Sequence, residues 1–158
     1  MKVRDLMTKT VASCRADTNL AAVGAAMWEN DCGVLPVIDE SGKVTGIVTD
    51  RDICIALSTR GGRSSELTAG EVAISPVLTC EPDDDVHSAL KTIREERIYR
   101  LPVVNRAGAL EGILSMDDIV RQAGKSNGKL KPDVSYDEIA QAFQQICARH
   151  GERRAVVA

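Results

Sequence analysis

The spacing of hydrophobic residues along the chain predicts helices and strands that alternate. Two segments carry apolar residues at helical spacing, so each predicts a helix with one apolar face. These residues are Leu20, Val23, Ala26 and Met27 in the first segment, and Val86, Ala89, Leu90 and Ile93 in the second. Four short runs rich in β-branched residues predict strands, at 34–38, 44–49, 100–104 and 110–115. Brief strands are also expected around Val11 and Val77, and further helices near Asp50 and Met116.

The residues between these segments predict how the elements begin and turn. Asp17-Thr18 and the acidic run 83–85 supply helix N-caps and negative charge at helix N-termini. Glycine-containing turns at 40–43 and 106–109 reverse the chain between neighbouring strands. Two of the predicted strands contain a proline, which lacks an N–H. Each of them should therefore lie at a sheet edge or carry an irregularity.

The element order β-α-β-β-α occurs twice because the sequence is duplicated. A shift of 66 residues, the separation of Pro36 and Pro102, aligns residues 4–53 with residues 70–119 without a gap. The identical pairs are Val11/Val77, Cys14/Cys80, Asp17/Asp83, Glu29/Glu95, Leu35/Leu101, Pro36/Pro102, Val37/Val103, Gly42/Gly108, Gly46/Gly112, Ile47/Ile113, Asp52/Asp118 and Ile53/Ile119. They fall at turns, in strand cores and at one acidic position, which chance would not place in one register.

One repeat is too small to bury its sheet alone. We therefore expect an α/β (α+β) fold of two β-α-β-β-α repeats packed about a pseudo-twofold axis, plus a C-terminal helix. The expected segments are repeat 1 (1–57), a linker (58–68), repeat 2 (69–123), a second linker (124–134) and the helix (135–150). A capping box from Ser135 to Glu138 starts that helix, and its apolar stripe is expected to pack on its own module or a dimer mate rather than a partner.

Composition and charge narrow the functional class. With 44% hydrophobic residues, 27% charged residues and a formal charge of −3, the chain is not expected to bind nucleic acid. It starts without a leader-like apolar segment and has no membrane-length apolar window, so a cytoplasmic protein that binds no membrane is expected. Five cysteines without paired spacing favour buried thiols over a zinc site or a disulfide framework, and a bridge between Cys14 and Cys80 is the alternative. Trp28, the only tryptophan, is expected to be partly buried.

The sharpest chemical motif is the segment 46–52, where a strand runs into a helix. Thr49 would place a hydroxyl beside free backbone N–H groups at a helix N-terminus, which suits a phosphate. The carboxylate of Asp52 can accept both hydroxyls of a ribose, and Arg51 can reach a phosphate. The alternative is that Thr49 and Asp52 form only a helix-capping box.

The second copy of this motif, 112–118, keeps two of its three groups. Ser115 and Asp118 match the hydroxyl and the carboxylate, whereas Asp117 replaces the arginine. An acidic residue there would repel a polyphosphate, so the two sites should differ in affinity or in preferred ligand. The sequence shows no glycine-rich phosphate loop, nucleophile elbow or cluster of His, Cys and carboxylates. We therefore expect no catalytic residues, no metal site, no catalytic cofactor and no enzyme.

The duplicated pattern resembles the CBS domain, which occurs in tandem pairs called Bateman modules. The matching features are a leader, Leu-Pro-Val, a tight glycine turn, Gly-Ile-(Val/Leu)-(Thr/Ser) and a following Asp, and they span about residues 3–122. The resemblance, which is to the small stand-alone type, implies a homodimer that binds an adenosine-containing ligand in clefts between the repeats. AMP, ADP, ATP, NAD and S-adenosylmethionine are the expected ligands, and the expected role is to regulate an unknown partner protein.

The same resemblance implies further ligand-binding residues. Positions that contact adenine in relatives correspond to Thr10, Val11, Pro76 and Val77. Tyr99 and Arg100 resemble a phosphate-binding pair: Tyr99 could stack on a base and Arg100 could reach a phosphate, or Arg100 is a surface residue at a sheet edge. Gly33 and Val34 leave room at the matching place but offer no charge. The competing function is a CBS-fold structural or interaction module whose sites have degenerated.

Overall fold

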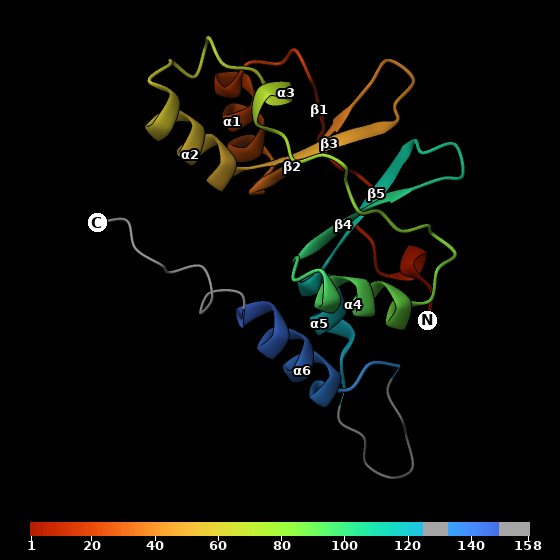
Figure 1. The fold of residues 1–158 in the computed structure, drawn as a ribbon. Coiled ribbons are helices and arrows are strands. Elements are labelled where there is room, and N and C mark those ends of the chain that lie inside the picture. The colour runs from red at the N-terminus through yellow and green to blue at the C-terminus, as the bar shows by residue number, and fades with distance from the viewer. Residues whose placement is uncertain (125–132, 149–158) are drawn as a thin grey trace. The chain divides into compact units, whose positions relative to one another are not determined.

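The computed structural model describes residues 1–124 and 133–148, which form a mixed α+β fold (Figure 1). The chain divides into two compact units. Of the described residues, unit 1 contains 1–8, 80–103, 113–124 and 133–148, and unit 2 contains 9–79 and 104–112. These units differ from the sequence repeats because each leader packs with the other repeat. The N–H of Val3 donates to the carbonyl of Asp84 (3.0 Å), and that of Ala69 donates to the carbonyl of Thr18 (2.8 Å).

Unit 2 holds the helices and the sheet of the first repeat. Its elements are β1 (Cys14–Arg15), α1 (Leu20–Glu29), β2 (Val34–Ile38), β3 (Val44–Thr49), α2 (Asp50–Arg60) and α3 (Ala69–Val72). The sheet order is β1-β2-β3, with β1 parallel and β3 antiparallel to β2. Its core consists of Cys14, Val23, Met27, Leu35, Val37, Val48 and Ala69. The inward faces of α1, α3 and the sheet thus bury one continuous apolar cluster.

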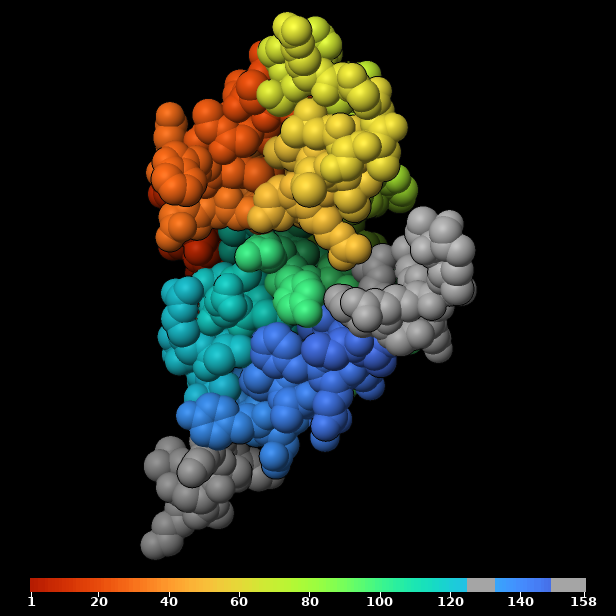
Figure 2. All heavy atoms as spheres, turned by 90° about the vertical axis from the view of Figure 1, so that its left-hand side faces the viewer, coloured from red at the N-terminus to blue at the C-terminus, as the bar shows by residue number. Residues whose placement is uncertain are grey.

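Unit 1 holds the helices of the second repeat and the C-terminal helix. Its elements are a 3-10 turn η1 (Val3–Asp5), α4 (Val86–Glu95), α5 (Met116–Gln122) and α6 (Tyr136–Cys147). Most of β4 (Arg100–Val104) and the second half of β5 (Leu110–Ser115) also lie in this unit. β4 and β5 pair with each other, and Cys80 adds a single parallel bridge to Val103. The expected C-terminal helix is present and lies against α4 (Figures 1 and 2). It completes a core that includes Leu90, Ile93, Ile119, Ile139, Ala142 and Ile146.

The four longer strands have the bounds that the sequence predicts, and α2 and α5 begin at the predicted residues. Two expectations in the first repeat are wrong. The first strand lies at Cys14–Arg15, not around Val11, because Cys14 is the residue that pairs with β2 and enters the core. The N-cap of α1 is Asn19, whose side chain accepts from the N–H of Ala22, and not Asp17 or Thr18. In addition, α2 continues to Arg60 and ends at Gly61 in the left-handed conformation.

The sequence predicts that a strand containing proline lies at a sheet edge or carries an irregularity, and β2 carries an irregularity. β2 is the central strand and not an edge, and its register with β3 shifts between Val37 and Ile38. The short β1 pairs with Val37 and Ile38 only, so the ladder on that side starts after Pro36. A proline is tolerated in this central strand because β1 is too short to need its missing N–H.

Candidate functional site

The candidate site in unit 2 lies where β3 runs into α2. The hydroxyl of Thr49 donates to Oδ2 of Asp52 (2.6 Å), and the backbone N–H of Thr49 donates to the same oxygen (2.9 Å). In return, the N–H of Asp52 donates to the Thr49 hydroxyl (3.2 Å). Thr49 and Asp52 therefore form the helix-capping box that the sequence analysis gives as the alternative to a ligand site. Because both of these bonds to the carboxylate use Oδ2, Oδ1 of Asp52 is left without a hydrogen-bond partner among the described residues.

The junction between β5 and α5 in unit 1 repeats this arrangement. The Ser115 hydroxyl donates to Oδ2 of Asp118 (2.5 Å), the Ser115 N–H donates to the same oxygen (2.9 Å), and the N–H of Asp118 donates back (3.2 Å). Asp118 is the more buried of the two acids, at 9% exposed, and Nη1 of Arg121 lies 4.0 Å from its Oδ1. The second carboxylate is thus less available to a ligand than the first.

The expectation of free N–H groups at the start of α2 is wrong. The N–H of Asp50 donates to the carbonyl of Gly33 (3.1 Å), that of Arg51 to Oδ1 of Asp50 (2.7 Å), and that of Asp52 to Thr49. In unit 1 the N–H of Met116 likewise donates to the carbonyl of Tyr99 (2.9 Å). Preceding residues satisfy these donors, so a phosphate at this helix would have to be bound by side chains.

The charged residues of the two junctions differ as the sequence indicates. Arg51 and Asp117 occupy matching exposed positions in the first turns of α2 and α5. Arg100 is half-buried at the start of β4. Neither Arg51 nor Arg100 forms an ion pair within residues 1–124 and 133–148. Both guanidinium groups can therefore bind an anionic group of a ligand without breaking an ion pair to another described residue.

The residues before the two Leu-Pro-Val strands are already in contact with other groups. Tyr99 is 43% exposed, and its ring packs against Phe143 of α6 with the centroids 6.5 Å apart. A Cβ added at Gly33 would lie 2.8 Å from Oδ2 of Asp50, so the space expected beside Gly33 is occupied by that carboxylate. Val34 is buried in β2 and presents no surface for a ligand.

The four expected adenine-contacting residues lie in irregular segments of unit 2. Thr10 and Pro76 are exposed, Val11 and Val77 are half-buried, and the Ser75–Pro76 peptide bond is cis. Ile74, two residues before Pro76, exchanges backbone hydrogen bonds with Ile47 of β3 (2.9 and 3.2 Å). Pro76 and Val77, from the second repeat, therefore follow directly on a segment paired with the strand that ends at Thr49.

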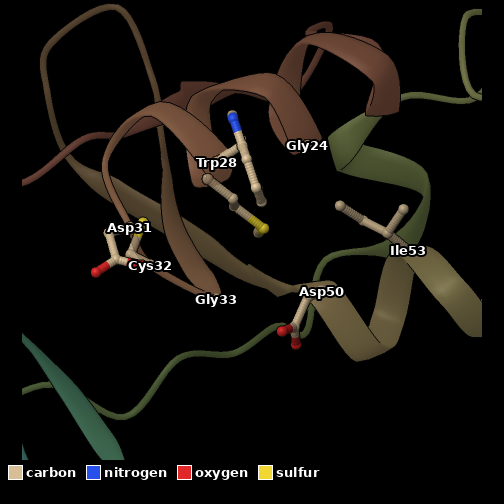
Figure 3. A pocket seen from close by; sticks show the side chains of 8 residues that line it. Gly24, Trp28, Asp31, Cys32, Gly33, Asp50 and Ile53 are labelled. Carbon is tan, nitrogen blue, oxygen red and sulfur yellow. The ribbon is translucent and has the colours of Figure 1, made fainter.

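A hollow on unit 2 contains residues that the sequence did not mark as functional. Its volume is about 420 Å³, and it lies between α1, the start of β2 and α2 (Figure 3). Its lining consists of Gly24, Met27, Trp28, Asp31, Cys32, Gly33, Asp50 and Ile53. Trp28 is 88% exposed, so the expectation of partial burial is wrong. The signal that could have found this surface is the uncharged stretch from Leu20 to Trp28, which leaves α1 apolar on all sides.

The five cysteines are free thiols. Burial raises the pKa of Cys14 to about 11, and burial together with the nearby charge of Asp84 raises that of Cys80 to about 12. Both thiols therefore stay protonated at neutral pH. Within the described ranges, His, Cys, Asp and Glu side chains form no group placed to hold a metal ion. The same ranges contain no helix that is long and apolar enough to cross a membrane.

Comparison with known proteins gives several similar chains, two of which were solved with an adenosine-containing compound bound. YhcV of Bacillus subtilis, a CBS domain-containing protein, is 27% identical over 87% of this chain and 97% of its own. The CBS domain pair of protein MJ0100, solved with 5′-methylthioadenosine and S-adenosyl-L-methionine, is 26% identical with a TM-score of 0.70 and covers 77% of this chain and 94% of its own. CBSX2 in complex with AMP is 25% identical with a TM-score of 0.67, covering 76% and 93%.

The chain spans only part of some other relatives. It matches 48% of a Methanopyrus kandleri protein, and 21–24% of a homoserine O-acetyltransferase and an inosine-5′-monophosphate dehydrogenase. The model of the CBS domain matches residues 3–59 and again residues 69–125, the two halves that the internal alignment also relates. The chain therefore belongs to the CBS domain family and carries two copies of the domain.

Proposed function

We propose that this chain is a regulatory module of signal transduction that binds an adenosine-containing ligand and modulates a partner protein. AMP, ADP, ATP, NAD and S-adenosylmethionine are the candidate ligands. The observation that carries the proposal is the repeated strand–helix junction, in which a hydroxyl and a carboxylate three residues apart are held together in both units. A fixed carboxylate beside a strand end is the group with which dinucleotide folds bind ribose hydroxyls.

The junction at Asp52 is the better candidate for a phosphorylated ligand. Oδ1 of Asp52 can accept hydrogen bonds from a ribose while Oδ2 remains in the capping box. Arg51, exposed in the same helical turn, can pair with a phosphate. At the other junction, Asp117 stands at the arginine's position and Asp118 is buried, so binding there should be weaker or favour a ligand without a polyphosphate.

Similar proteins support the ligand class. The MJ0100 domain pair holds two adenosyl compounds and CBSX2 holds AMP, and each covers about three quarters of this chain at 25–26% identity. The family is typically regulatory, and we propose that this chain has no enzymatic activity of its own. We further propose a cytoplasmic homodimer, because cysteines that remain free thiols suit a reducing compartment and Bateman modules commonly pair.

One observation favours the second candidate, a CBS-fold interaction module without a ligand. Both carboxylates already have a structural role, since each closes the capping box at the start of its helix. A helix cap of this kind stabilises a protein by about 1 kcal/mol, which is sufficient reason for these residues to be present. The two candidates differ in whether removing the carboxylate changes only stability or also ligand binding.

Isothermal titration calorimetry on the ligand-free full chain separates them. Each of the five compounds is titrated, and the one that binds is compared with its 2′,3′-dideoxy analogue. We expect the analogue to bind at least about tenfold more weakly, because it has no ribose hydroxyls to donate to Oδ1 of the half-buried Asp52. Asp52→Ala should remove this discrimination between ligand and analogue.

Glu71→Ala is the matched control. Glu71 closes an equivalent capping box on Thr68 at the start of α3, outside both junctions. The control should lower stability to a similar degree and leave ligand affinity unchanged. If the double variant Asp52→Ala, Asp118→Ala still binds the ligand as the unmodified chain does, the proposed ribose contacts are wrong. If none of the five compounds binds, the interaction module is the better account.

A further inference from the structure

Phe143 of α6 contacts a residue of the candidate site, although α6 lies outside both matched domains. The second match ends at residue 125, and α6 runs from Tyr136 to Cys147. The ring of Phe143 lies 6.5 Å from the ring of Tyr99, with the two planes inclined by 51°. Tilted aromatic pairs at this separation are favourable. An element outside the family model thus touches a residue that is expected to bind the ligand.

α6 is held in place independently of its contact with Tyr99. Three of its residues are buried in the core of unit 1: Ile139, Ala142 and Ile146. The helix lies against α4 (Figure 1), where Oε1 of Glu138 lies 3.2 Å from Nδ1 of His87. Undocking α6 would expose several apolar side chains, which together cost more than one aromatic pair contributes. The contact therefore restrains the Tyr99 ring, while Phe143 is fixed by its own helix.

Tyr99 is joined through its backbone to the junction between β5 and α5. Its carbonyl oxygen accepts a hydrogen bond from the N–H of Met116 (2.9 Å), the first residue of α5. Ser115, the residue before Met116, forms the capping box with Asp118. The half-buried Arg100 follows Tyr99 directly along the chain. Tyr99 is thus linked to both of the charged groups of unit 1 that are expected to bind a ligand.

The contact with Phe143 leaves part of the Tyr99 ring free. Tyr99 remains 43% exposed although Phe143 lies against it, because a ring inclined by 51° covers only part of its neighbour. An exposed tyrosine without such a contact samples several rotamers, and a ligand that stacks on its ring loses affinity because one rotamer must be fixed. Phe143 lowers this cost because it restrains the ring before the ligand binds.

The first repeat has no equivalent of this aromatic pair. In the 66-residue register, the separation of Pro36 and Pro102, the position of Tyr99 corresponds to Gly33. A Cβ added at Gly33 would lie 2.8 Å from Oδ2 of Asp50, so even the start of a side chain would meet that carboxylate. The first junction therefore offers no aromatic ring from this position. Any effect of Phe143 on a ligand should be confined to the second junction.

We propose that Phe143 is a positioning residue for ligand binding at the junction between β5 and α5. It holds the Tyr99 ring in the orientation in which the base of an adenosine-containing ligand stacks on the ring's open face. The inference rests on the proposed function, since it requires such a ligand at this junction. By thermodynamic linkage, a ligand that uses the Tyr99 ring strengthens the docking of α6 by the same factor. The docking of α6 therefore depends on whether the second junction is occupied.

The chain has two tyrosines, which allows the second junction to be followed by itself. NMR of the full chain with isotope-labelled tyrosine gives the ring signals of Tyr99 and of Tyr136, which is 50% exposed at the start of α6. AMP and S-adenosylmethionine are titrated separately, and the Tyr99 signals give the Kd at this junction. We expect these signals to shift with at least one of the two compounds, whereas those of Tyr136 stay unchanged.

Three variants measure the contribution of Phe143. Phe143→Leu keeps an apolar side chain against the core but removes the ring, and it should raise the Kd about two- to tenfold, the range that an aromatic pair contributes. Phe143→Tyr keeps the ring and should retain the Kd of the unmodified chain. Ile146→Val is the matched control, because it removes one methylene from the buried face of the same helix and keeps both rings. It should lower stability and leave the Kd unchanged.

Two results would overturn the inference while a ligand still binds. The first is a Kd in Phe143→Leu that equals that of the unmodified chain, or Tyr99 signals that do not move although calorimetry shows binding. The second is an equal rise in Kd in Phe143→Leu and Ile146→Val, which would show that only the stability of α6 matters. If calorimetry shows no binding of any compound, the proposed function fails and this inference fails with it.

Discussion

The ring of Tyr99 lies against the ring of Phe143, with centroids 6.5 Å apart and planes inclined by 51°. Tyr99 is the residue expected to stack on a base, and Phe143 belongs to α6, which lies beyond the residues matched by the CBS domain. A second link joins the same elements, since Nδ1 of His87 lies 3.2 Å from Oε1 of Glu138. The helix that is additional to the family fold thus rests directly on a candidate ligand residue.

The packing of α6 predicts a large effect of truncating its buried face. Ile146 is 1% exposed and belongs to the core of unit 1. Ile146→Ala should therefore lower the free energy of unfolding by about 2–5 kcal/mol, because it removes buried methyl groups and leaves a cavity. Urea denaturation followed by circular dichroism measures this change. Gln145→Ala, on the exposed side of the same helix, should stay within about 0.5 kcal/mol, and an equal loss in both variants would contradict the packing of α6.

Gly24 offers the opposite prediction, a gain in stability. It lies inside α1, where glycine is less favourable than alanine, and no other group approaches the position of an added Cβ. Gly24→Ala should therefore raise the free energy of unfolding by about 1 kcal/mol. A decrease in the melting temperature would show that the helix has a close neighbour at this position.

The thiols should fall into distinct reactivity classes. Cys54 and Cys147 are exposed and should react rapidly with a thiol reagent at neutral pH. Cys14 and Cys80 should react only on unfolding, since burial raises both pKa values far above neutrality. Counting labelled thiols by mass spectrometry, with and without denaturant, checks this. If oxidation lowers the count in denaturant by two and leaves the count without denaturant unchanged, the result would instead support a bridge between the two buried cysteines.

The start of α6 should be sensitive to acid. The backbone N–H of Ser135, its hydroxyl and the neighbouring His87 together hold the pKa of Glu138 below its ordinary value of 4.5. A carboxylate whose pKa is lowered on folding stabilises the native state above its unfolded pKa, and this stabilisation is lost as the pH falls through the folded pKa. Stability should thus decline below about pH 4.5 through this group.

Glu138→Gln tests the acid response. Glutamine keeps a hydrogen-bonding side chain at the capping position but does not titrate, so the variant should be less stable at neutral pH and should lose less stability on acidification. Urea denaturation at neutral and acidic pH gives both quantities. If the stability of the variant depends on pH in the same way as that of the unmodified chain, the acid sensitivity comes from other carboxylates.

Sequence patterns were sufficient to predict most of the fold. The β-branched runs around Pro36 and Pro102 and the capping residues Thr49, Ser115 and Ser135 fix strand and helix bounds by local chemistry, and the structure has them as predicted. The first strand was misplaced because a two-residue strand leaves no periodic signal. The exchange of the leaders was also not foreseen, since it depends on long-range hydrogen bonds, such as that of Val3 to Asp84, that no local pattern encodes.

The candidate site was predictable in composition and less so in geometry. Motif spacing identified Asp52 and Asp118, but it did not show that the N–H groups beside them are satisfied by Gly33 and Tyr99. The hollow on unit 2 was missed because a hollow is a property of neighbouring elements, and glycine at position 24 gives only a weak signal in a single chain. The duplication did contain that signal, since position 90 holds leucine.

The central claim, that the chain binds an adenosyl ligand, is tested most directly by thermal unfolding of the ligand-stripped protein. The panel contains AMP, ADP, ATP, NAD and S-adenosylmethionine, each at millimolar concentration. A ligand present at about 100 times its Kd stabilises the native state by about 2.7 kcal/mol. For a chain of 158 residues this corresponds to a rise in Tm of roughly 5–10 °C. We expect such a rise with at least one compound and its loss in Asp52→Ala, whereas an unchanged Tm with all five would contradict the claim.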